Sequence, residues 1–395
     1  MDIAPIISEE PLKPAIYLIS TTAWQTFHVD AGSPGCDRDA MPSNNKSITT
    51  GLATVLITLS LTGCTGISRS GDLAGVTVDV RNELLMFDGH SGDPIRWEDL
   101  MTRVASADVI IIGEQHDDAV GHAVQRAVIE DAVARGSNLA LSMEMLDRSE
   151  QSIVDDYVAE LIDREKFYEL TASTEWRKVV NEYLAGEINK SKFKEQILRI
   201  GWPDWETNYQ PIIDAAKDGG ARIVAANAPW LRYTKLITKD GYEKLETLTD
   251  EQRRLIDTPE VPESGKYRER FWEVMVDRAE GEEPKESESD GDDPEVEHIE
   301  MSDEDVLRSF HSQMMYDATM AGSMAEALKS GAEKVIHLVG QFHSDFEGGT
   351  VMELRRRVPD ARILLISMQK ESAAALREED TDRADIVIYT GARED

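Results

Sequence analysis

The sequence predicts an α/β fold, a mostly parallel β-sheet with helices on both faces and a helical insert. Two observations support this prediction. Short runs of β-branched and apolar residues recur along the chain, such as Val109-Ile110-Ile111-Ile112, as in strands that are buried on both faces. Helical stretches separate most of these runs, and strands that alternate with helices form βαβ units around a parallel sheet.

The predicted elements follow in order along the chain. A short hairpin is compatible with residues 81–95, and residues 118–135 form an amphipathic helix. The long helical insert occupies residues 150–220. The strands are predicted at 109–112, 139–143, 223–226, 335–339, 363–367 and 386–389.

The insert contains an internal repeat. The segment IVDDYVAELIDREKF (153–167) aligns on VVNEYLAGEINKSKF (179–193), and Trp176 aligns on Trp202 at the same offset. Each copy indicates a helix, a turn and a second helix, so we interpret the pair as a helical cap over one edge of the sheet. Two unrelated amphipathic hairpins are the alternative.

Charge and cysteine content exclude several classes of function. The 395 residues include 76 Asp and Glu against 42 Lys and Arg, for a net charge of −34. A surface this negative repels phosphate backbones, which excludes nucleic acid as a partner. The two cysteines, Cys36 and Cys64, rule out a disulfide framework.

An export signal is predicted near the N-terminus. Residues 48–63 are uncharged and largely apolar, Lys46 precedes them, and Leu61-Thr62-Gly63-Cys64 resembles a bacterial lipobox. We therefore predict a lipoprotein signal peptide at 41–63, with Cys64 as the lipidation site. A buried apolar helix that ends in Gly-Cys is the alternative.

This interpretation sets the domain boundaries and the location. Residues 1–40 are then an over-read upstream of the true start, 64–95 an anchor and linker, and 96–395 the α/β domain. Thr65, in place of Asp, resembles an outer-membrane sorting signal, so we expect a lipid-anchored protein that faces the periplasm.

Residues 279–305 differ from the rest of the domain. They hold 14 acids, one Lys and no aromatic residue, so they cannot bury enough surface to offset the entropy of ordering. We predict a disordered acidic loop. The alternative, a cation-binding segment, lacks the fixed spacing and glycine of a calcium loop.

Polar side chains follow four of the predicted strands. Glu114 and His116 follow the first, Glu144 ends the second, Asn227 the third, and His343 follows the fourth. The carboxyl ends of parallel strands meet at one edge of a sheet, so these residues should converge. Two imidazoles and two carboxylates suit a divalent transition metal, which makes Glu114, His116, Glu144 and His343 candidate ligands.

Each of these signals is weak alone. A Glu after a strand is more often a helix N-terminal acid, and a loop His is more often a surface or core residue. The joint pattern is stronger, because both histidines stand in a G-x-x-H frame directly after an apolar strand. His122, Gln125, Asn227 and Phe342 are expected to line the same pocket.

The ordered motifs resemble the ChaN family of haem-binding lipoproteins, in a superfamily with the Tiki and TraB proteins and the erythromycin esterases. The resemblance covers about residues 100–370. It rests on GEQHD (113–117), LSMEM (141–145), GWPDWETNYQPI (201–212), ANAP (226–229), QMMYDATMAGSMAEAL (313–328) and HLVGQFHSDFEGG (337–349).

The resemblance implies the same α/β fold, a helical subdomain, and a role in haem and iron uptake. By position it makes His116, His343 and Glu144 metal or catalytic groups, with Glu114 beside them. Phe342 and Trp230 depart from the family pattern, and would either narrow a polar pocket or offer a flat apolar surface to haem. Haem needs an axial ligand, for which Tyr209 and Tyr316 are candidates.

The sequence is therefore compatible with two functions. The first is an exported, lipid-anchored protein of the ChaN type that binds haem or iron, or another small-molecule ligand, with a homodimer left open. The second is a hydrolase in which a divalent metal lowers the pKa of a bound water. In the second, Glu114 or Glu144 is the general base, or His116 in a metal-free variant.

Overall fold

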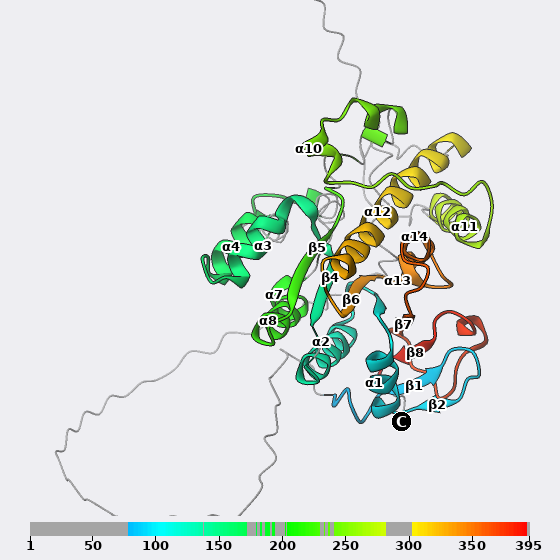
Figure 1. Cartoon of the computed structure of the whole chain (residues 1–395). Coiled ribbons are helices and arrows are strands. Elements are labelled where there is room, and N and C mark those ends of the chain that lie inside the picture. The colour runs from blue at the N-terminus through cyan, green and yellow to red at the C-terminus, as the bar shows by residue number, and fades with distance from the viewer. Residues whose placement is uncertain are drawn as a thin grey trace, which may run out of the picture. The chain divides into compact units, whose positions relative to one another are not determined.

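The computed structural model describes residues 78–136, 138–171, 204–229, 241–281 and 302–392, with isolated positions at 179–202 and 233–237 (Figure 1). All of them belong to one compact unit of the chain. Within this part, no helix is long and apolar enough to cross a membrane. The predictions for residues 1–63, Cys64, Thr65, Trp176 and Trp230 lie outside the described residues.

Eight strands form one sheet in the order β2-β1-β8-β7-β3-β6-β4-β5. The six strands from β8 to β5 run parallel, and β1 runs antiparallel to both β2 and β8. This confirms the predicted fold class and all six predicted strands. The bounds are β1 (Leu85–Asp88), β2 (Pro94–Ile95), β3 (Val109–Glu114), β4 (Leu139–Asp147), β5 (Arg222–Asn227), β6 (Lys334–Gly340), β7 (Ile363–Gln369) and β8 (Ile386–Tyr389).

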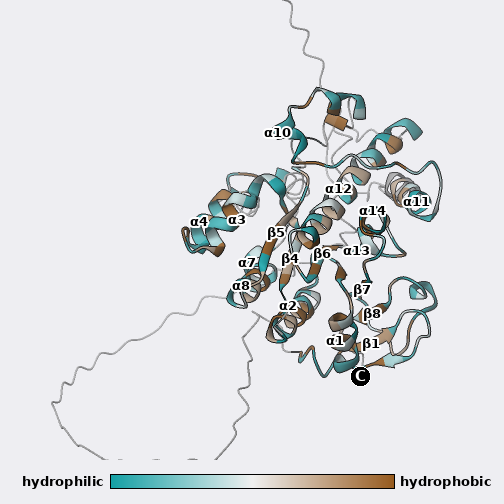
Figure 2. Cartoon of the chain, viewed as in Figure 1, coloured by the Kyte–Doolittle hydropathy of each residue, from teal (hydrophilic) through white to brown (hydrophobic). Residues whose placement is uncertain are grey.

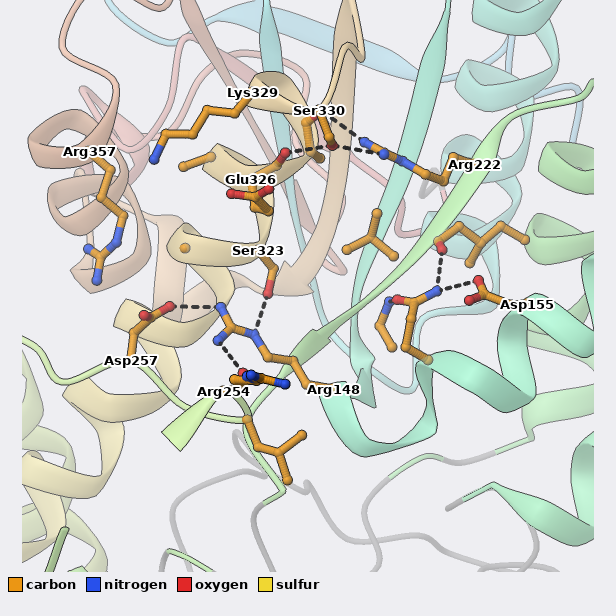
Figure 3. A pocket seen from close by; sticks show the side chains of 18 residues that line it. Arg148, Asp155, Arg222, Arg254, Asp257, Ser323, Glu326, Lys329, Ser330 and Arg357 are labelled. Atoms are coloured by element: carbon orange, nitrogen blue, oxygen red, sulfur yellow. Dashed lines mark hydrogen bonds and ion pairs between the residues drawn. The ribbon is translucent and has the colours of Figure 1, made fainter. Parts of the chain in front are cut away.

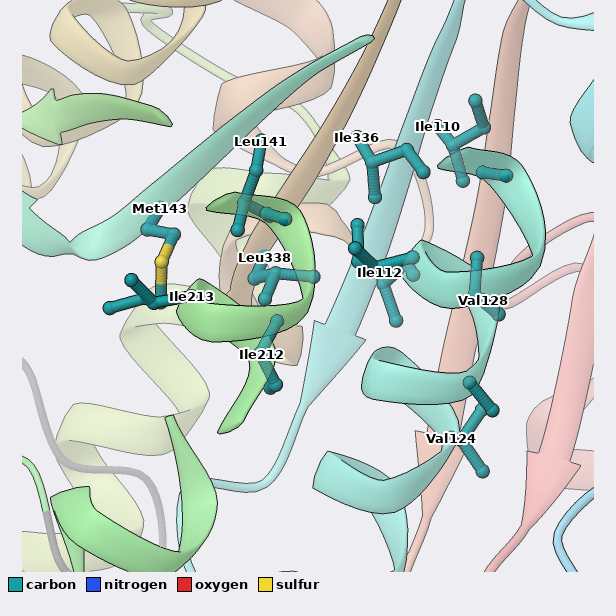
Figure 4. Packing of buried hydrophobic residues seen from close by; sticks show 14 of the residues in the cluster. Ile110, Ile112, Val124, Val128, Leu141, Met143, Ile212, Ile213, Ile336 and Leu338 are labelled. Atoms are coloured by element: carbon teal, nitrogen blue, oxygen red, sulfur yellow. The ribbon is translucent and has the colours of Figure 1, made fainter. Parts of the chain in front are cut away.

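The burial of strand β3 on both faces of the sheet explains why its sequence is continuously apolar. All six of its residues are buried. Successive side chains point to opposite faces, so Ile110 and Ile112 enter one core while Val109 and Ile111 enter the other. Figure 4 shows Ile110 and Ile112 on the first face, together with Val124 of α2. Burying one such side chain contributes roughly 1.5–3 kcal/mol to stability.

Helices cover both faces of the sheet. The core of the first face includes residues of α1 (Trp97–Ser106), α2 (Ala119–Ala134) and α8 (Gln210–Asp218). The core of the second face includes residues of α12 (Asp303–Lys329) and α14 (Gly349–Arg357). In Figure 2 the central strands β4 and β6 are largely hydrophobic, whereas the short helix α10 is hydrophilic.

The remaining helical segments are short, apart from α11. In chain order they are η1 (Arg148–Glu150), α3 (Gln151–Val158), α4 (Arg164–Leu170), α7 (Trp205–Asn208), η2 (Tyr242–Thr247), α10 (Asp250–Arg253), α11 (Lys266–Gly281), α13 (Gln341–Ser344) and η3 (Glu378–Asp380).

The described positions of the insert support the internal repeat. In the first copy Tyr157 stacks on Phe167 with ring centroids 4.8 Å apart, and in the second Tyr183 stacks on Phe193 at 4.4 Å. The turns match as well. The Leu161 N–H donates to the Asp156 carbonyl at 2.9 Å, and the Glu187 N–H donates to the Glu182 carbonyl at 2.8 Å.

Two elements of the structure extend beyond the predicted boundaries. The acidic loop was placed at 279–305, but α11 continues to Gly281 and α12 begins at Asp303, where the Ser302 side chain accepts from the Asp305 N–H. The Ser302 cap and the acids of the first turn suit a helix N-terminus. Residues 282–301 lie outside the described part.

The second is the hairpin of β1 and β2, which precedes the predicted start of the α/β domain at residue 96. The hairpin of β1 and β2 lies inside the predicted linker, yet Met86 of β1 pairs with Ile388 of β8. Met86 and Phe87 are both buried, so this short apolar run adds an edge to the sheet instead of acting as a tether.

Strand β5 lies at the other edge of the sheet, where free backbone groups could pair with another chain. The side chain of Gln151 occupies this edge. Its Nε2 donates to the Ile223 carbonyl at 3.0 Å, and its Oε1 accepts from the Ala225 N–H at 2.8 Å. One amide thus satisfies two backbone groups that a neighbouring strand would otherwise bind.

Candidate functional site

The polar residues predicted to converge do lie at one edge of the sheet. Strands β3, β6, β4 and β5 are parallel neighbours, so their carboxyl ends face the same way. Glu114 ends β3, Glu144 lies in β4, and His343 lies in α13 directly after β6. Glu114, His116, Glu144 and His343 are at most 7% exposed.

Glu114 is the centre of the first group of contacts. The His116 Nδ1 lies 2.8 Å from its Oε1, and the Tyr209 hydroxyl donates to the same oxygen at 2.6 Å. The Gln125 Nε2 donates to its Oε2 at 2.5 Å, and His122 in turn contacts the Gln125 Oε1 at 3.0 Å. His122 and Gln125 are therefore part of the hydrogen-bond network around Glu114.

The charge state of Glu114 follows from these contacts. Complete burial acts to raise the pKa of its carboxyl, but the charges of His122 and His116 and the hydrogen bonds from His116 and Tyr209 lower this pKa to about 2. Glu114 is therefore a carboxylate throughout the physiological range, and a weak proton acceptor.

His343 is the centre of the second group. Its Nδ1 lies 2.7 Å from the Asp317 Oδ1, and Asp317 also accepts from the Tyr267 hydroxyl at 2.7 Å and the Thr350 hydroxyl at 2.6 Å. The opposite ring nitrogen of His343 lies 3.5 Å from the Glu144 Oε1. Burial acts to lower the pKa of His343, but the negative charges of Asp317 and Glu144 raise it to about 9.

Gly340 and Glu144 join the two groups. The Gly340 N–H donates to the Glu144 Oε2 at 2.6 Å. A Cβ on Gly340 would lie 3.1 Å from the His116 Nε2 and 3.5 Å from the Glu144 Oε2. Burial acts to lower the pKa of His116, but Glu114 and then Glu144 raise it, against the opposing charge of His343. The two groups therefore form one electrostatic network.

The expected four-residue metal site is not supported. Among the described residues, no group of three or more His, Cys, Asp or Glu side chains is arranged to hold a metal ion. The carboxylate oxygens already have partners. Glu114 accepts from His116, Tyr209 and Gln125, and Glu144 accepts from the Gly340 N–H.

Two other residues predicted to line the pocket have local partners. The Asn227 side chain accepts from the Ala228 N–H at 2.8 Å. Phe342 packs against the rings of Tyr267 and Phe271, with centroids 5.5 and 6.1 Å away. Asn227 lies at the end of β5, and Phe342 belongs to an aromatic cluster whose member Tyr267 also donates to Asp317.

The two candidate haem ligands are buried. Tyr209 is fully buried, and its hydroxyl is bound to Glu114. Tyr316 is 6% exposed, and burial together with the charge of Glu144 raises the pKa of its hydroxyl. Burial likewise raises the pKa of Tyr209. An iron-bound tyrosinate must lose its proton, so neither residue fits this role as it stands here.

Sequence reasoning missed the residues that hold His343. Asp317 and Gln313 come from α12, Tyr267 from α11 and Thr350 from α14. Asp317 is fully buried in an otherwise largely apolar stretch of helix, and that isolated acid was an available signal. The ring of Trp202 meets the His116 ring edge-on at 4.8 Å, although the repeat and the motif at 201–212 gave this residue no role in the site.

Comparison with known families identifies the chain. The family described as "Haem-binding uptake, Tiki superfamily, ChaN" matches residues 100–183 and 173–354. These matches cover more than half of the chain, so the protein belongs to this haem-binding uptake family of the Tiki superfamily. The match confirms the resemblance drawn from the motifs.

Two solved structures are similar to the chain. One is described as "Cofacial heme binding to ChaN of Campylobacter jejuni", with 16% identity, a TM-score of 0.49, and coverage of 78% of this chain and 97% of that chain. The other, "The structure of the type III effector HopBA1", has 11% identity, a TM-score of 0.34, and coverage of 80% and 100%. No curated protein matches.

Proposed function

We propose that the protein is an exported, lipid-anchored haem-binding protein of the ChaN type. The family match over residues 100–354 carries the haem part of this proposal. The apolar run at 48–63 and the Leu61-Thr62-Gly63-Cys64 frame carry the anchor, with attachment to an outer membrane on the periplasmic side. Replacing Cys64 with Ser should then release the protein from the membrane fraction of a Gram-negative host.

Haem binding is proposed without Tyr209 or Tyr316 as the iron ligand, because both hydroxyls are buried and hold their protons firmly. Titration of haemin into the full chain, followed by its Soret absorption, tests this proposal. We expect saturable binding and an unchanged bound spectrum in Tyr209→Phe and Tyr316→Phe. Absence of saturable binding would refute haem binding, and loss of the bound spectrum in one variant would restore that tyrosine as the ligand.

The strand-end network favours a second candidate function, metal-free hydrolysis of an ester or amide. The specific observation is that Glu144 lies 3.5 Å from His343 and close to His116, two histidines whose pKa values are raised. In this proposal Glu144 orients and deprotonates a water, while the protonated imidazoles stabilise the negative charge that develops on the substrate oxygen. Glu114 is too weak a base and instead holds His116 in place.

Hydrolysis is tested with a panel of chromogenic esters in the presence and absence of a chelator. We expect activity that survives chelation and is lost in Glu144→Gln. Thr350→Val, which removes a hydrogen bond to Asp317 but no charge, should retain most of the activity. Activity that disappears with the chelator would instead indicate a metal-dependent enzyme.

A further inference from the structure

A cavity of about 730 Å³ lies beside the edge strand β5, between this strand, the second half of α12 and the segment from Arg148 to Asp155 (Figure 3). None of its lining residues belongs to the network around Glu144 and His343. Its volume falls within the roughly 300–1,000 Å³ that is typical of small-molecule sites.

The charge of this cavity is opposite to that of the chain as a whole. Acids outnumber bases by 76 to 42 over the full sequence. Among the described residues of the cavity lining, five bases face three acids, Asp155, Asp257 and Glu326. The bases are Arg148, Arg222, Arg254, Lys329 and Arg357.

Two of the five bases are bound to acids. Arg148 pairs with Asp257 at 2.7 Å, and Arg357 binds the carboxylate of Glu353. Both guanidinium groups are therefore held in fixed positions at the cavity wall. They stiffen the cavity wall. Because each is paired with a carboxylate, they add less net positive charge to the cavity than the other three bases do.

The other three bases have no carboxylate partner within the described part of the chain. Arg222 donates to the Ala327 carbonyl at 2.8 Å and to the Ser330 hydroxyl at 2.9 Å, at the C-terminal end of α12. Arg254 and Lys329 extend from different elements, and Figure 3 shows them at separate sides of the cavity. Positive charge is thus available at more than one point around the cavity.

We propose that this cavity binds a small organic anion that carries two or more carboxylate or phosphate groups. The planar guanidinium group matches both of these anions. Ile223, Val224 and Leu255 offer apolar surface to the carbon skeleton of the ligand. Among the described residues, the lining contains no His, Tyr, Cys or Met, so it offers no usual axial ligand for haem iron, and the anion proposed here is not haem.

Binding is tested by calorimetric titration of the full chain at constant ionic strength, with citrate and pyrophosphate as separate probes. The variant Arg254→Gln/Lys329→Gln removes two charges whose side chains make no hydrogen bond within the described residues. The control Arg308→Gln/Arg355→Gln removes two charges from α12 and α14, outside the cavity. We expect the first variant to weaken binding at least tenfold and the control to weaken it less than twofold.

The choice of probe separates the two sources of anion. Tighter binding of citrate indicates a polycarboxylate ligand, and tighter binding of pyrophosphate indicates a phosphate ester. The proposal is overturned if the wild-type chain binds neither probe saturably. It is also overturned if the control loses as much affinity as the cavity variant, since the effect is then one of overall charge.

Discussion

Replacing Asp317 with Asn should remove the main support of the protonated state of His343. The carboxylate lies 2.7 Å from the His343 Nδ1 and is fully buried. Its charge, with that of Glu144, raises the pKa of His343 from 6.5 to about 9. At roughly 1.4 kcal/mol per pKa unit, this increase corresponds to a contribution on the order of 3 kcal/mol to the free energy of unfolding.

The contribution of His343 to the free energy of unfolding depends on pH. Because the pKa of His343 is raised on folding, its stabilising contribution is complete below about pH 6.5 and is lost as the pH rises towards 9. The wild-type free energy of unfolding should therefore fall across this window relative to that of Asp317→Asn. Urea unfolding at pH 6, 7.5 and 9 measures both, and NMR titration of the histidines gives the pKa directly.

Thr350→Val is the matched control. It removes a hydrogen bond to the same Asp317 oxygen but leaves the negative charge in place. We expect a constant loss of about 1 kcal/mol at all three pH values. If Asp317→Asn also shifts stability by the same amount at pH 6 and pH 9, the proposed role of the Asp317 charge is wrong.

Three further local features are each tested by substitution. Gly340→Ala places a Cβ 3.1 Å from the His116 Nε2, so it should perturb the His116 NMR signals far more than the loop substitution Gly331→Ala, and unchanged signals would contradict the close approach. Glu160→Gly relieves a positive φ of 59° and should stabilise the fold by up to about 1 kcal/mol. At the equivalent position of the second copy, Gly186→Ala introduces a side chain at a φ of 74° and should destabilise the fold. Effects of equal sign would argue against matching turns. Gln151→Ala leaves the Ile223 carbonyl and the Ala225 N–H at the sheet edge without this partner, so it should increase aggregation in light scattering more than Ser152→Ala does.

The parallel sheet was predictable because its strands are buried on both faces. The run at 109–112 is apolar at every position, and only a strand covered on both sides needs this pattern. Convergence of the strand ends followed from the topology alone, so Glu114, His116, Glu144 and His343 could be grouped before any distance was known. The glycine of each G-x-x-H frame was also recognised. Gly340 has a φ of −55°, so a glycine is favoured at this position by the close approach of His116 and not by a left-handed turn.

The chemistry of the network was less predictable. A carboxylate–histidine set is compatible with a metal site until the competing donors are known. Here these donors are Tyr209, Gln125 and the Gly340 N–H, two of which come from segments far from Glu114 and Glu144 in sequence. The same holds for Asp317, which contacts His343 only because α12 packs on the second face of the sheet. Hydrophobic periodicity indicates that a helix is buried but not which polar side chain it brings to a site.

The most direct test of haem binding is retention of haem by the full chain. The protein is incubated with excess haemin, passed through a desalting column, and assayed for haem by the pyridine haemochrome method and for metals in the same sample. The proposed haem binding, which rests on the family match, predicts that haem stays with the protein at a fixed ratio. A protein that leaves the column free of haem would contradict the proposed function.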